Sequence, residues 1–331
     1  MSQQSLAFEI GTEEIPAFDL SNAVKQLQTL APRLLDEAAI PHGETEVYSS
    51  PRRLIVVVHD IPEATEEKNE VFKGPSAKIA FDEEGNPTKA AQGFARGKGI
   101  DPSELVVEEL CVCTYHTPSV QVSSLLSNVL EGIVRGISWP KSQRWGSESE
   151  YFSRPIRWFV ALFGSEVVPF TFAGLSADRL TYGHRFLAPG PFSVANADEL
   201  VSTVRKAFVV PSEKEREEVI REGVSEIEQK TGFHAVLPPK TLVEVVNLAE
   251  YPSALMGTFD EEFLQVPEEI IVDAMLMHQR YFPLYDNDNK LTNRLSWWAM
   301  AILHALRPSL MAMNVWCALA YTMQNSSMMK I

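Results

Sequence analysis

The sequence predicts a mixed α+β fold that begins with a β-α-β-β unit, and its hydrophobic periodicity supports this prediction. Residues 6–10 alternate as in a short strand, and residues 44–50 form a second strand pattern. Residues 54–59 (LIVVVH) are a β-branched run typical of a buried strand. Between these strands, apolar side chains in residues 20–35 recur at helical spacing. A second long helical pattern at residues 212–232 places helices in the later part of the chain.

A compact corner follows the first strand. Gly11 breaks the strand pattern, and the adjacent carboxylates Glu13 and Glu14 come directly after it. The simplest interpretation is that these acids lie near the N-terminus of the next helix, where negative charge is favoured. We expect Asp19 to cap that helix, and Pro32 to kink it or to begin a second helix.

Four parts are predicted along the chain. They are a β-α-β-β unit (1–62), a mixed α/β region continuing the N-terminal body (63–208), a mainly helical segment ending in a hairpin (209–294) and an aberrant apolar tail expected to be poorly ordered (295–331). The elements expected in the second part are turns at 73–76 and 82–87, helices at 88–98 and 123–137, β structure at 106–122, strands at 159–163 and 167–172, and a seam at 189–191.

The third part contains the helix with the clearest ends. Ser212 and Glu215 form a capping box, and Gly232 is a typical C-terminal stop. We expect the charged face of this helix, residues 213–228, to be solvated. The further elements expected here are a helix at 240–248, a helix beginning at Pro267 and a hairpin over 282–291.

Composition limits the classes of function. The net charge of −15 excludes a protein that coats polyanions in general, so any nucleic-acid contact requires a local basic patch. The three cysteines, Cys111, Cys113 and Cys317, form neither a disulfide framework nor a zinc-ligand spacing, so reduced thiols are expected. The N-terminus has no basic start and no long apolar core, so we expect a cytoplasmic protein without a signal peptide.

Cations and aromatic rings are interleaved over residues 135–158. This pattern suits RNA backbone and exposed bases, but it also suits an aromatic core covered by arginine side chains. Because the stretch runs into the apolar residues 159–163, part of it must be core. Arg52 and Arg53 lie at the start of a predicted strand. Their side chains are either exposed to solvent at the edge of the sheet or placed to bind phosphate through their guanidinium groups.

The sequence shows no nucleophile–base pair, metal cluster or phosphate loop, so we assign no catalytic residue and no metal ligand. The segment GFARGKG lacks the spacing of a P-loop and does not follow a strand. His184 beside Arg185 could act as a general base, but a structural or RNA-facing role is the alternative. A hydrolase using His184 or His278 would need a nucleophile close to one of them in space.

Several strings together resemble one family. They are EIGTEEIPA, SPRRL, AAQGFARG, RPIRWFVAL, GHRF and HQRYF, in that order along the chain. Each is modest alone, but in this order they resemble the β subunit of the bacterial two-subunit glycyl-tRNA synthetase. The resemblance runs from residue 6 to about residue 294 and is weakest around residues 111–121. Gln143 stands where the family pattern would have a methionine.

The resemblance implies a role in a heterotetrameric (α2β2) ligase that attaches glycine to tRNA(Gly) with ATP. In that family the α subunit carries the active site and uses ATP with Mg, while the β subunit binds tRNA and supports the assembly; neither DNA nor a membrane is an expected partner. The residues expected to contact tRNA or the α subunit are Arg52, Arg53, Arg144, Arg154, Arg157, His184 and Arg185. A non-catalytic truncated scaffold, without aminoacylation activity, is the alternative function.

The composition of the sequence changes after Arg294. Residues 295–331 are rich in Trp, Met and Ala and carry no acidic residue. We expect a frameshift near residue 295, because a neighbouring frame can be read as family-like sequence, and a chain shortened before the HD-type and anticodon-binding domains. A membrane helix is the rival interpretation, but Arg307 and Pro308 split the apolar run into pieces too short to span a bilayer.

Overall fold

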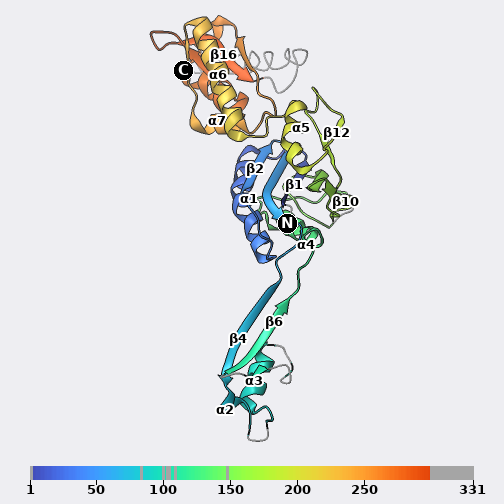
Figure 1. Cartoon of the computed structure of the whole chain (residues 1–331). Helices are drawn as coiled ribbons and strands as arrows, with labels where there is room; N and C mark the ends of the chain where they lie inside the picture. The colour runs from blue at the N-terminus through green and yellow to red at the C-terminus, as the bar shows by residue number, and fades with distance from the viewer. Residues whose placement is uncertain are drawn as a thin grey trace. The chain divides into compact units, whose positions relative to one another are not determined.

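The computed structural model describes residues 3–82, 85–98, 101, 106–107, 110–146 and 149–298. The chain forms two compact units, a smaller one over residues 62–124 and a larger one built from the chain on either side of it (Figure 1). The predicted boundary at residue 62 lies where the smaller unit begins, whereas the predicted region 63–208 is divided near residue 124. The predicted mixed α+β class is confirmed.

A five-stranded sheet organises the larger unit. Its strands in spatial order are β2 (Thr45–Ser50), β3 (Arg53–Pro62), β1 (Gln3–Thr12), β7 (Ile156–Phe163) and β8 (Glu166–Val167). Pairs β2–β3, β1–β7 and β7–β8 are antiparallel. The order of elements in the first sixty residues is the predicted β-α-β-β.

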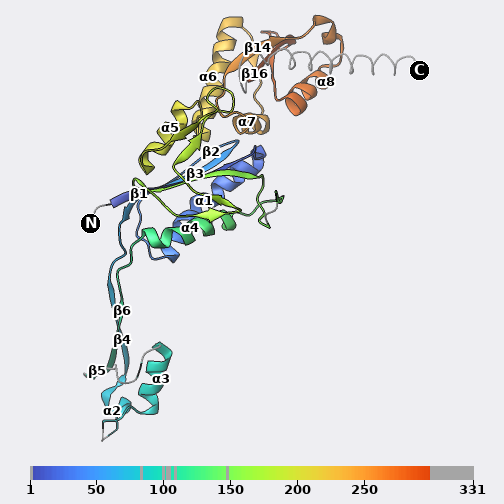
Figure 2. The ribbon, with the colours of Figure 1, turned by 90° about the vertical axis from the view of Figure 1, so that its right-hand side faces the viewer.

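The sheet is buried on both faces. On one face, Ala7, Val160 and Leu162 pack against apolar side chains of η2 and α5, including Leu200 and Val204. Successive residues of a strand point to opposite faces, so Phe8 lies on the other side, where it stacks on Phe159. The elements on the first face are the 3-10 helix η2 (Ala197–Glu199) and α5 (Leu200–Lys206), and Figure 2 shows α1 (Ala17–Glu37) and α4 (Ser123–Gly136) together on the opposite side.

Helix α1 differs from its prediction at two positions. It begins after Pro16 with no side-chain cap, and Asp19 lies in its first turn instead of capping it. Negative charge there still favours the helix N-terminus. Pro32 neither restarts nor interrupts the helix. Its ring removes one backbone hydrogen bond to Gln28, and because Gln28 lies on the exposed side, water can satisfy that carbonyl.

Short strands complete this part of the larger unit. They are β9 (Thr171–Phe172) with β10 (Leu175–Ser176), and β11 (Leu180–Tyr182) with β12 (Pro191–Ser193). The single strand predicted at 167–172 is therefore two strands, β8 and β9. The seam predicted at 189–191 is the connection inside a hairpin, since Pro191 pairs with Tyr182.

Among its described residues, the smaller unit has a three-stranded sheet and two helices. Its elements are β4 (Lys68–Ser76), β5 (Val106–Val107), β6 (Leu110–Thr117), α2 (Ala77–Ala80) and α3 (Lys89–Lys98). The turn predicted at 73–76 is the irregular end of β4, where the pairing with β6 shifts between Lys73 and Ser76. At the base of this unit, Val122 N–H donates to the Glu63 carbonyl, and Ala64 pairs with Gln121.

The later part of the larger unit combines helices with a sheet. Its elements are α6 (Glu213–Thr231), β13 (His234–Ala235), α7 (Pro239–Val246), β14 (Ala254–Thr258), the 3-10 helix η3 (Glu261–Gln265), α8 (Glu268–Asp273), the π-helix η4 (Ala274–Gln279), β15 (Phe282–Tyr285) and β16 (Leu291–Trp298). The hairpin β15–β16 was predicted, but β13 and β14 extend it to a four-stranded sheet in the order β13-β15-β16-β14. This part is therefore more than the mainly helical segment that was predicted.

Part of the predicted tail is ordered structure. Leu295 and Ser296 are buried in β16, which pairs with β14. Residues 299–331 lie outside the described residues, and so do the side chains of the three cysteines predicted to be reduced thiols. The predictions made for those positions therefore stay predictions.

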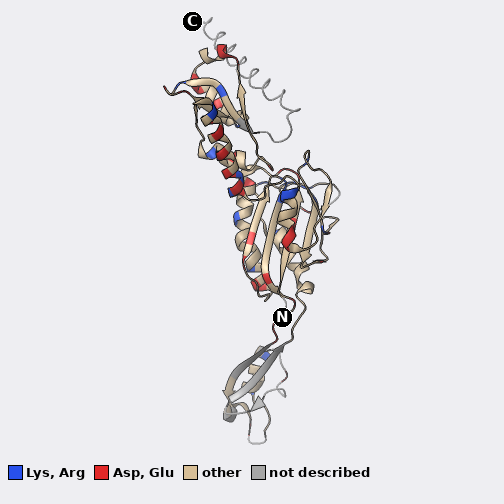
Figure 3. Cartoon of the chain, turned by 45° about the horizontal axis from the view of Figure 1, so that its top comes forward, with Lys and Arg blue, Asp and Glu red and all other residues tan. Residues whose placement is uncertain are grey.

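Helix α6 has the predicted ends but not the predicted solvated face. Ser212 accepts a hydrogen bond from Glu215 N–H, and Gly232 ends the helix in the left-handed conformation. Acidic and basic positions follow each other along α6 (Figure 3). One cation of that face, Arg216, is completely buried. The prediction that the whole face is solvated is therefore wrong.

Arg216 is buried because backbone carbonyls satisfy its guanidinium. It donates to the carbonyls of Ser49 (2.5 Å), Val210 (2.8 Å) and Val246 (2.8 Å), and to the side-chain oxygen of Asn247. Burial lowers the pKa of Arg216 to about 10, so it stays charged at neutral pH. The contacts join α6 and the end of α7 to the end of β2.

We expect Arg216→Met to lower the free energy of unfolding by about 3 kcal/mol, because several buried carbonyls lose their donor. Urea unfolding followed by circular dichroism measures this change. Arg221→Met is the matched control, since Arg221 lies on the exposed side of the same helix and pairs only with Glu217 there. Its effect should stay within about 0.5 kcal/mol. Equal effects of the two substitutions would contradict the assigned role of Arg216.

Candidate functional site

The corner after β1 is built around a glycine beneath a tryptophan. Gly11 pairs with Trp158 across β1 and β7, and a Cβ atom at position 11 would lie 1.9 Å from the indole ring. Only glycine therefore leaves room for the ring. A bulge follows Gly11, and Thr12 N–H then donates to the carbonyl of Arg52 (2.8 Å). This turn places Glu13 and Glu14 beside the arginine pair at positions 52 and 53.

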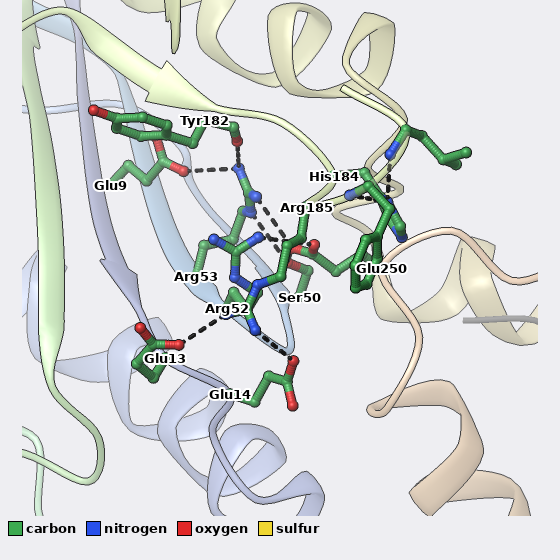
Figure 4. A network of polar contacts seen from close by, with 12 residues as sticks. Glu9, Glu13, Glu14, Ser50, Arg52, Arg53, Tyr182, His184, Arg185 and Glu250 are labelled. Atoms are coloured by element: carbon green, nitrogen blue, oxygen red, sulfur yellow. Dashed lines mark hydrogen bonds and ion pairs between the residues drawn. The ribbon is translucent and has the colours of Figure 1, made fainter. Parts of the chain in front are cut away.

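Arg53 lies at the centre of a buried polar network (Figure 4). Its Nη1 donates to Glu9 Oε1 (3.1 Å) and to the carbonyl of Tyr182 (2.7 Å). Its Nη2 donates to Glu250 Oε1 (3.1 Å), and its Nε to Ser50 Oγ (3.1 Å). The Arg53 side chain is completely buried. Arg53 is therefore a structural residue, and its predicted contact with RNA or a subunit is corrected because the guanidinium has no access to a partner.

The two carboxylates around Arg53 have opposite pKa shifts. Burial raises the pKa of Glu9, and the charge of Arg53 opposes this rise only in part. Burial would also raise the pKa of Glu250, but Arg53 and Arg52, with the Ser50 hydroxyl, hold it below its usual value. Glu250 is therefore the ionised partner that compensates the buried positive charge.

A cavity of about 420 Å³ opens beside this network. The residues that line it are Glu13, Arg52, Arg157, Trp158, Tyr182 and Arg185. The Arg52 side chain is 12% exposed, its Nη1 lies 3.5 Å from Glu250 Oε2, and its guanidinium lies 5.6 Å from the centroid of the Trp158 ring. Burial lowers the pKa of Arg52, Glu250 opposes this, and the positive charges of Arg53 and Arg185 add to the lowering.

Glu13 holds the two outer arginines of the cavity. Its carboxylate lies 2.8 Å from Arg185 Nη2 and 3.5 Å from Arg157 Nε. Arg157 and Arg185 are 60% and 43% exposed at their side chains. Arg154 lies at the same corner, where its Nε donates to the carbonyl of Glu14 (3.1 Å). The exposed guanidinium groups can bind an anion that approaches from solvent.

Two of the predicted site residues, Arg144 and His184, do not line the cavity. Arg144 does not line the cavity; its guanidinium lies 5.8 Å from the centroid of the Tyr151 ring. His184 is buried, and its Nδ1 accepts hydrogen bonds from the backbone N–H groups of Phe186 and Leu187. These contacts favour a structural histidine that holds the turn containing Arg185, in line with the structural role that was predicted as an alternative to a general base.

The stretch from residue 135 to residue 158 contributes to the core as expected. Phe152 and Trp158 are buried, and Trp139 packs edge-on against Phe152 at 4.8 Å between ring centroids. Tyr151 is exposed. The prediction that part of this set is core is confirmed. Of the cations in this set, Arg157 lines the cavity, and Arg154 lies beside it at the Glu14 carbonyl.

A serine, a histidine and a glutamate meet on the central sheet, away from the cavity. Ser5 Oγ lies 3.2 Å from His59 Nδ1, and His59 Nε2 lies 3.2 Å from Glu46 Oε2. Ser5 is buried within β1, and its carbonyl accepts a hydrogen bond from Gly164 N–H. Because a nucleophilic hydroxyl must reach its substrate, this arrangement does not support a hydrolase.

Sequence reasoning missed Glu9 and Glu250. The signal for Glu9 was present, since it is a lone carboxylate between Phe8 and Ile10 in an otherwise apolar strand. A charge at such a position needs a buried partner. Glu250 carries no comparable signal, because it meets Arg53 only through the tertiary fold.

The part of the chain that the structure describes lacks two features. No group of three or more His, Cys, Asp or Glu side chains there is placed to hold a metal ion. Among the same residues, no helix combines the length and the apolar character needed to cross a membrane.

Comparison with known proteins gives a consistent family. The family model described as "Glycyl-tRNA synthetase beta subunit" matches residues 6–296. A glycine–tRNA ligase beta subunit from Moorella thermoacetica is 41% identical over 299 residues, which cover 88% of this chain and 43% of the relative. The corresponding protein of Desulforamulus reducens is 40% identical over 294 residues, covering 86% and 42%. The chain thus spans less than half the length of these relatives.

We expect Glu250→Gln to lower the free energy of unfolding at neutral pH by about 3 kcal/mol, because Arg53 loses its ionised partner. The folded-state pKa of Glu250 is below its unfolded value, so the stability it contributes is present above the unfolded pKa and is lost as pH falls through the folded pKa. The difference between wild type and variant should therefore shrink in acid. Urea unfolding of both proteins at neutral and acidic pH checks this, and a difference independent of pH would contradict it.

Proposed function

The chain belongs to the glycyl-tRNA synthetase beta subunit family, and from that premise we propose that it binds tRNA(Gly) and assembles with a catalytic alpha subunit. The observation that carries the tRNA part is a group of guanidinium groups, exposed or half-buried, around the cavity beside Trp158. Arg154, Arg157 and Arg185 meet at this corner from two separate segments of the chain. We call this group the arginine corner.

The chemistry of the arginine corner suits a phosphate backbone. Guanidinium groups bind phosphate through two parallel hydrogen bonds, and phosphate contacts supply most of the affinity of non-specific RNA binding. The chain as a whole is acidic, with a net charge of −15, so it would repel RNA over most of its surface. A local basic corner would therefore determine where the RNA approaches.

In the proposed assembly, this chain supports a reaction that the alpha subunit performs. Glycine is attached to tRNA with ATP, and ATP with Mg is bound by the alpha subunit in a cytoplasmic α2β2 heterotetramer. The residues of this chain would hold and orient the tRNA. The competing proposal is a scaffold that binds without supporting aminoacylation.

We expect the double charge reversal R154E/R157E to weaken binding of tRNA(Gly) roughly tenfold at low salt, because two phosphate-facing cations become anions. Fluorescence anisotropy with labelled tRNA over a salt series measures the loss. The matched control is R33E/R221E, which reverses two exposed arginines that pair with glutamates one helical turn away. Equal losses in the two double variants would remove the arginine corner from the proposal.

Assembly is tested with the purified alpha subunit. We expect a complex by size exclusion with light scattering, and charging of tRNA in the same mixture. A complex without charging would favour the scaffold. Absence of any complex would contradict the assembly proposal.

A further inference from the structure

The geometry points to a seat for a single RNA backbone phosphate in the cavity beside Trp158, where Glu13 acts as an internal counter-ion that the phosphate replaces. This inference rests on the proposed function, because the phosphate belongs to the tRNA that binds at the arginine corner. It goes further because it assigns to Glu13, a residue of the site itself, a role that lowers the affinity for RNA.

Arg52 brings to the cavity wall a positive charge that its own contacts compensate only in part. Nε and Nη1 of Arg52 are buried and have no hydrogen-bond partner among the described residues, although Nη1 lies 3.5 Å from Glu250 Oε2. Glu250 is already bound by Arg53 and by Ser50. Arg52 therefore shares Glu250 with a better-placed arginine, and its incompletely compensated charge favours an anion in the cavity that Arg52 lines.

The site favours a phosphate over a base. Trp158 is only 8% exposed, and the guanidinium groups of Arg52 and Arg53 lie 5.6 Å from the centroid of its ring. Its ring is thus already used in cation–π contacts and packing, and Tyr182 lies against it at 5.0 Å between centroids. A base would find no open ring to stack on there, whereas a phosphate would meet the charged groups of three arginines.

Glu13 is placed to compete with such a phosphate and to leave. Its carboxylate makes one close contact, with Arg185, and one longer contact, with Arg157. The side chain is 39% exposed, while its backbone is anchored by the hydrogen bond from Glu13 N–H to the Pro155 carbonyl. Rotation of the side chain would free Arg157 and Arg185 from Glu13 without moving β1, and Arg185 would keep its longer contact with Glu14 (3.7 Å).

The strength of phosphate binding would then depend on how much more favourable the pairing of the arginines with the phosphate is than their pairing with Glu13. An exposed ion pair contributes little, about 0.2–1 kcal/mol, so a backbone phosphate, whose single negative charge is shared by two oxygens, can displace the carboxylate. While Glu13 stays in place, it also repels the phosphate. Removing its charge should therefore strengthen RNA binding, although the substitution removes two ion pairs from the folded protein.

The test compares the full chain with Glu13→Gln and a matched control, Glu37→Gln. Both substitutions remove one negative charge, but Glu37 pairs with Arg33 on α1 and does not line the cavity. Binding of tRNA(Gly) is measured by anisotropy over a salt series. We expect E13Q to raise the affinity about threefold to tenfold at low salt and E37Q to leave it within about twofold. E13D, which keeps the charge on a shorter side chain, should gain less than E13Q and guards against an effect of misfolding.

Two further arms separate the possible outcomes. In the background of Arg157→Gln, the gain from E13Q should shrink, because the two side chains share one site. Inorganic phosphate, at ionic strength matched with chloride, should compete with tRNA more strongly on E13Q than on wild type. Unchanged or weaker tRNA binding by folded E13Q would overturn the inference, and so would stronger phosphate binding without stronger tRNA binding. Wild type that fails to bind tRNA at all would instead contradict the proposed function.

Discussion

The buried charge of Arg53 is the constraint on which the larger unit depends. A guanidinium without access to water is tolerated only when carboxylates and carbonyls surround it. Those partners come from four places: Glu9 from β1, Ser50 from the end of β2, the Tyr182 carbonyl from β11 and Glu250 from the segment after α7. The need to compensate one cation thus joins the central sheet to the later part of the chain.

The buried charge of Arg216 is compensated by neutral partners. Its guanidinium binds backbone carbonyls at the ends of β2 and α7 and in the segment before α6, instead of carboxylates. The two buried arginines therefore secure the same junction in different electrostatic ways. The carboxylate network depends on the ionisation of Glu250, whereas the carbonyl network has no acidic partner within hydrogen-bond distance among its described contacts, so acid should affect the two unequally.

Local signals predicted most elements, and tertiary contacts explain the differences. The periodicity of α1, α4 and α6 and the β-branched run of β3 are properties of neighbouring residues, so the sequence reveals them directly. A glycine–proline pair in residues 73–76 indicated a turn, but pairing with β6 holds these residues at the end of β4. Likewise, Arg216 has the sequence context of a solvated helix face, and only the partners from β2 and α7 make its burial possible.

The candidate site could be predicted in part for the same reason. Arg52, Arg154, Arg157 and Arg185 were recognisable as cations in unusual contexts, and the fold brings them to one corner. Their partners were not recognisable, because Glu13 had a sufficient local explanation at a helix start. The distinction between Arg52 and Arg53 was also hidden. Adjacent residues of a strand entry point in different directions, so one arginine lines the cavity while the other is enclosed.

The backbone hydrogen bonds at the base of the smaller unit have a consequence for how the chain can fold. The pairs that join residues 63–65 to residues 120–122 bring the two ends of this long insertion together. Once they form, the connection between β3 and α4 behaves kinetically as a short loop. The antiparallel pairing of β1 with β7 then closes a shorter loop and costs less conformational entropy. The gain is modest, because closure entropy grows only with the logarithm of loop length. An order of folding in which the insertion closes first would lower the effective contact order of the central sheet.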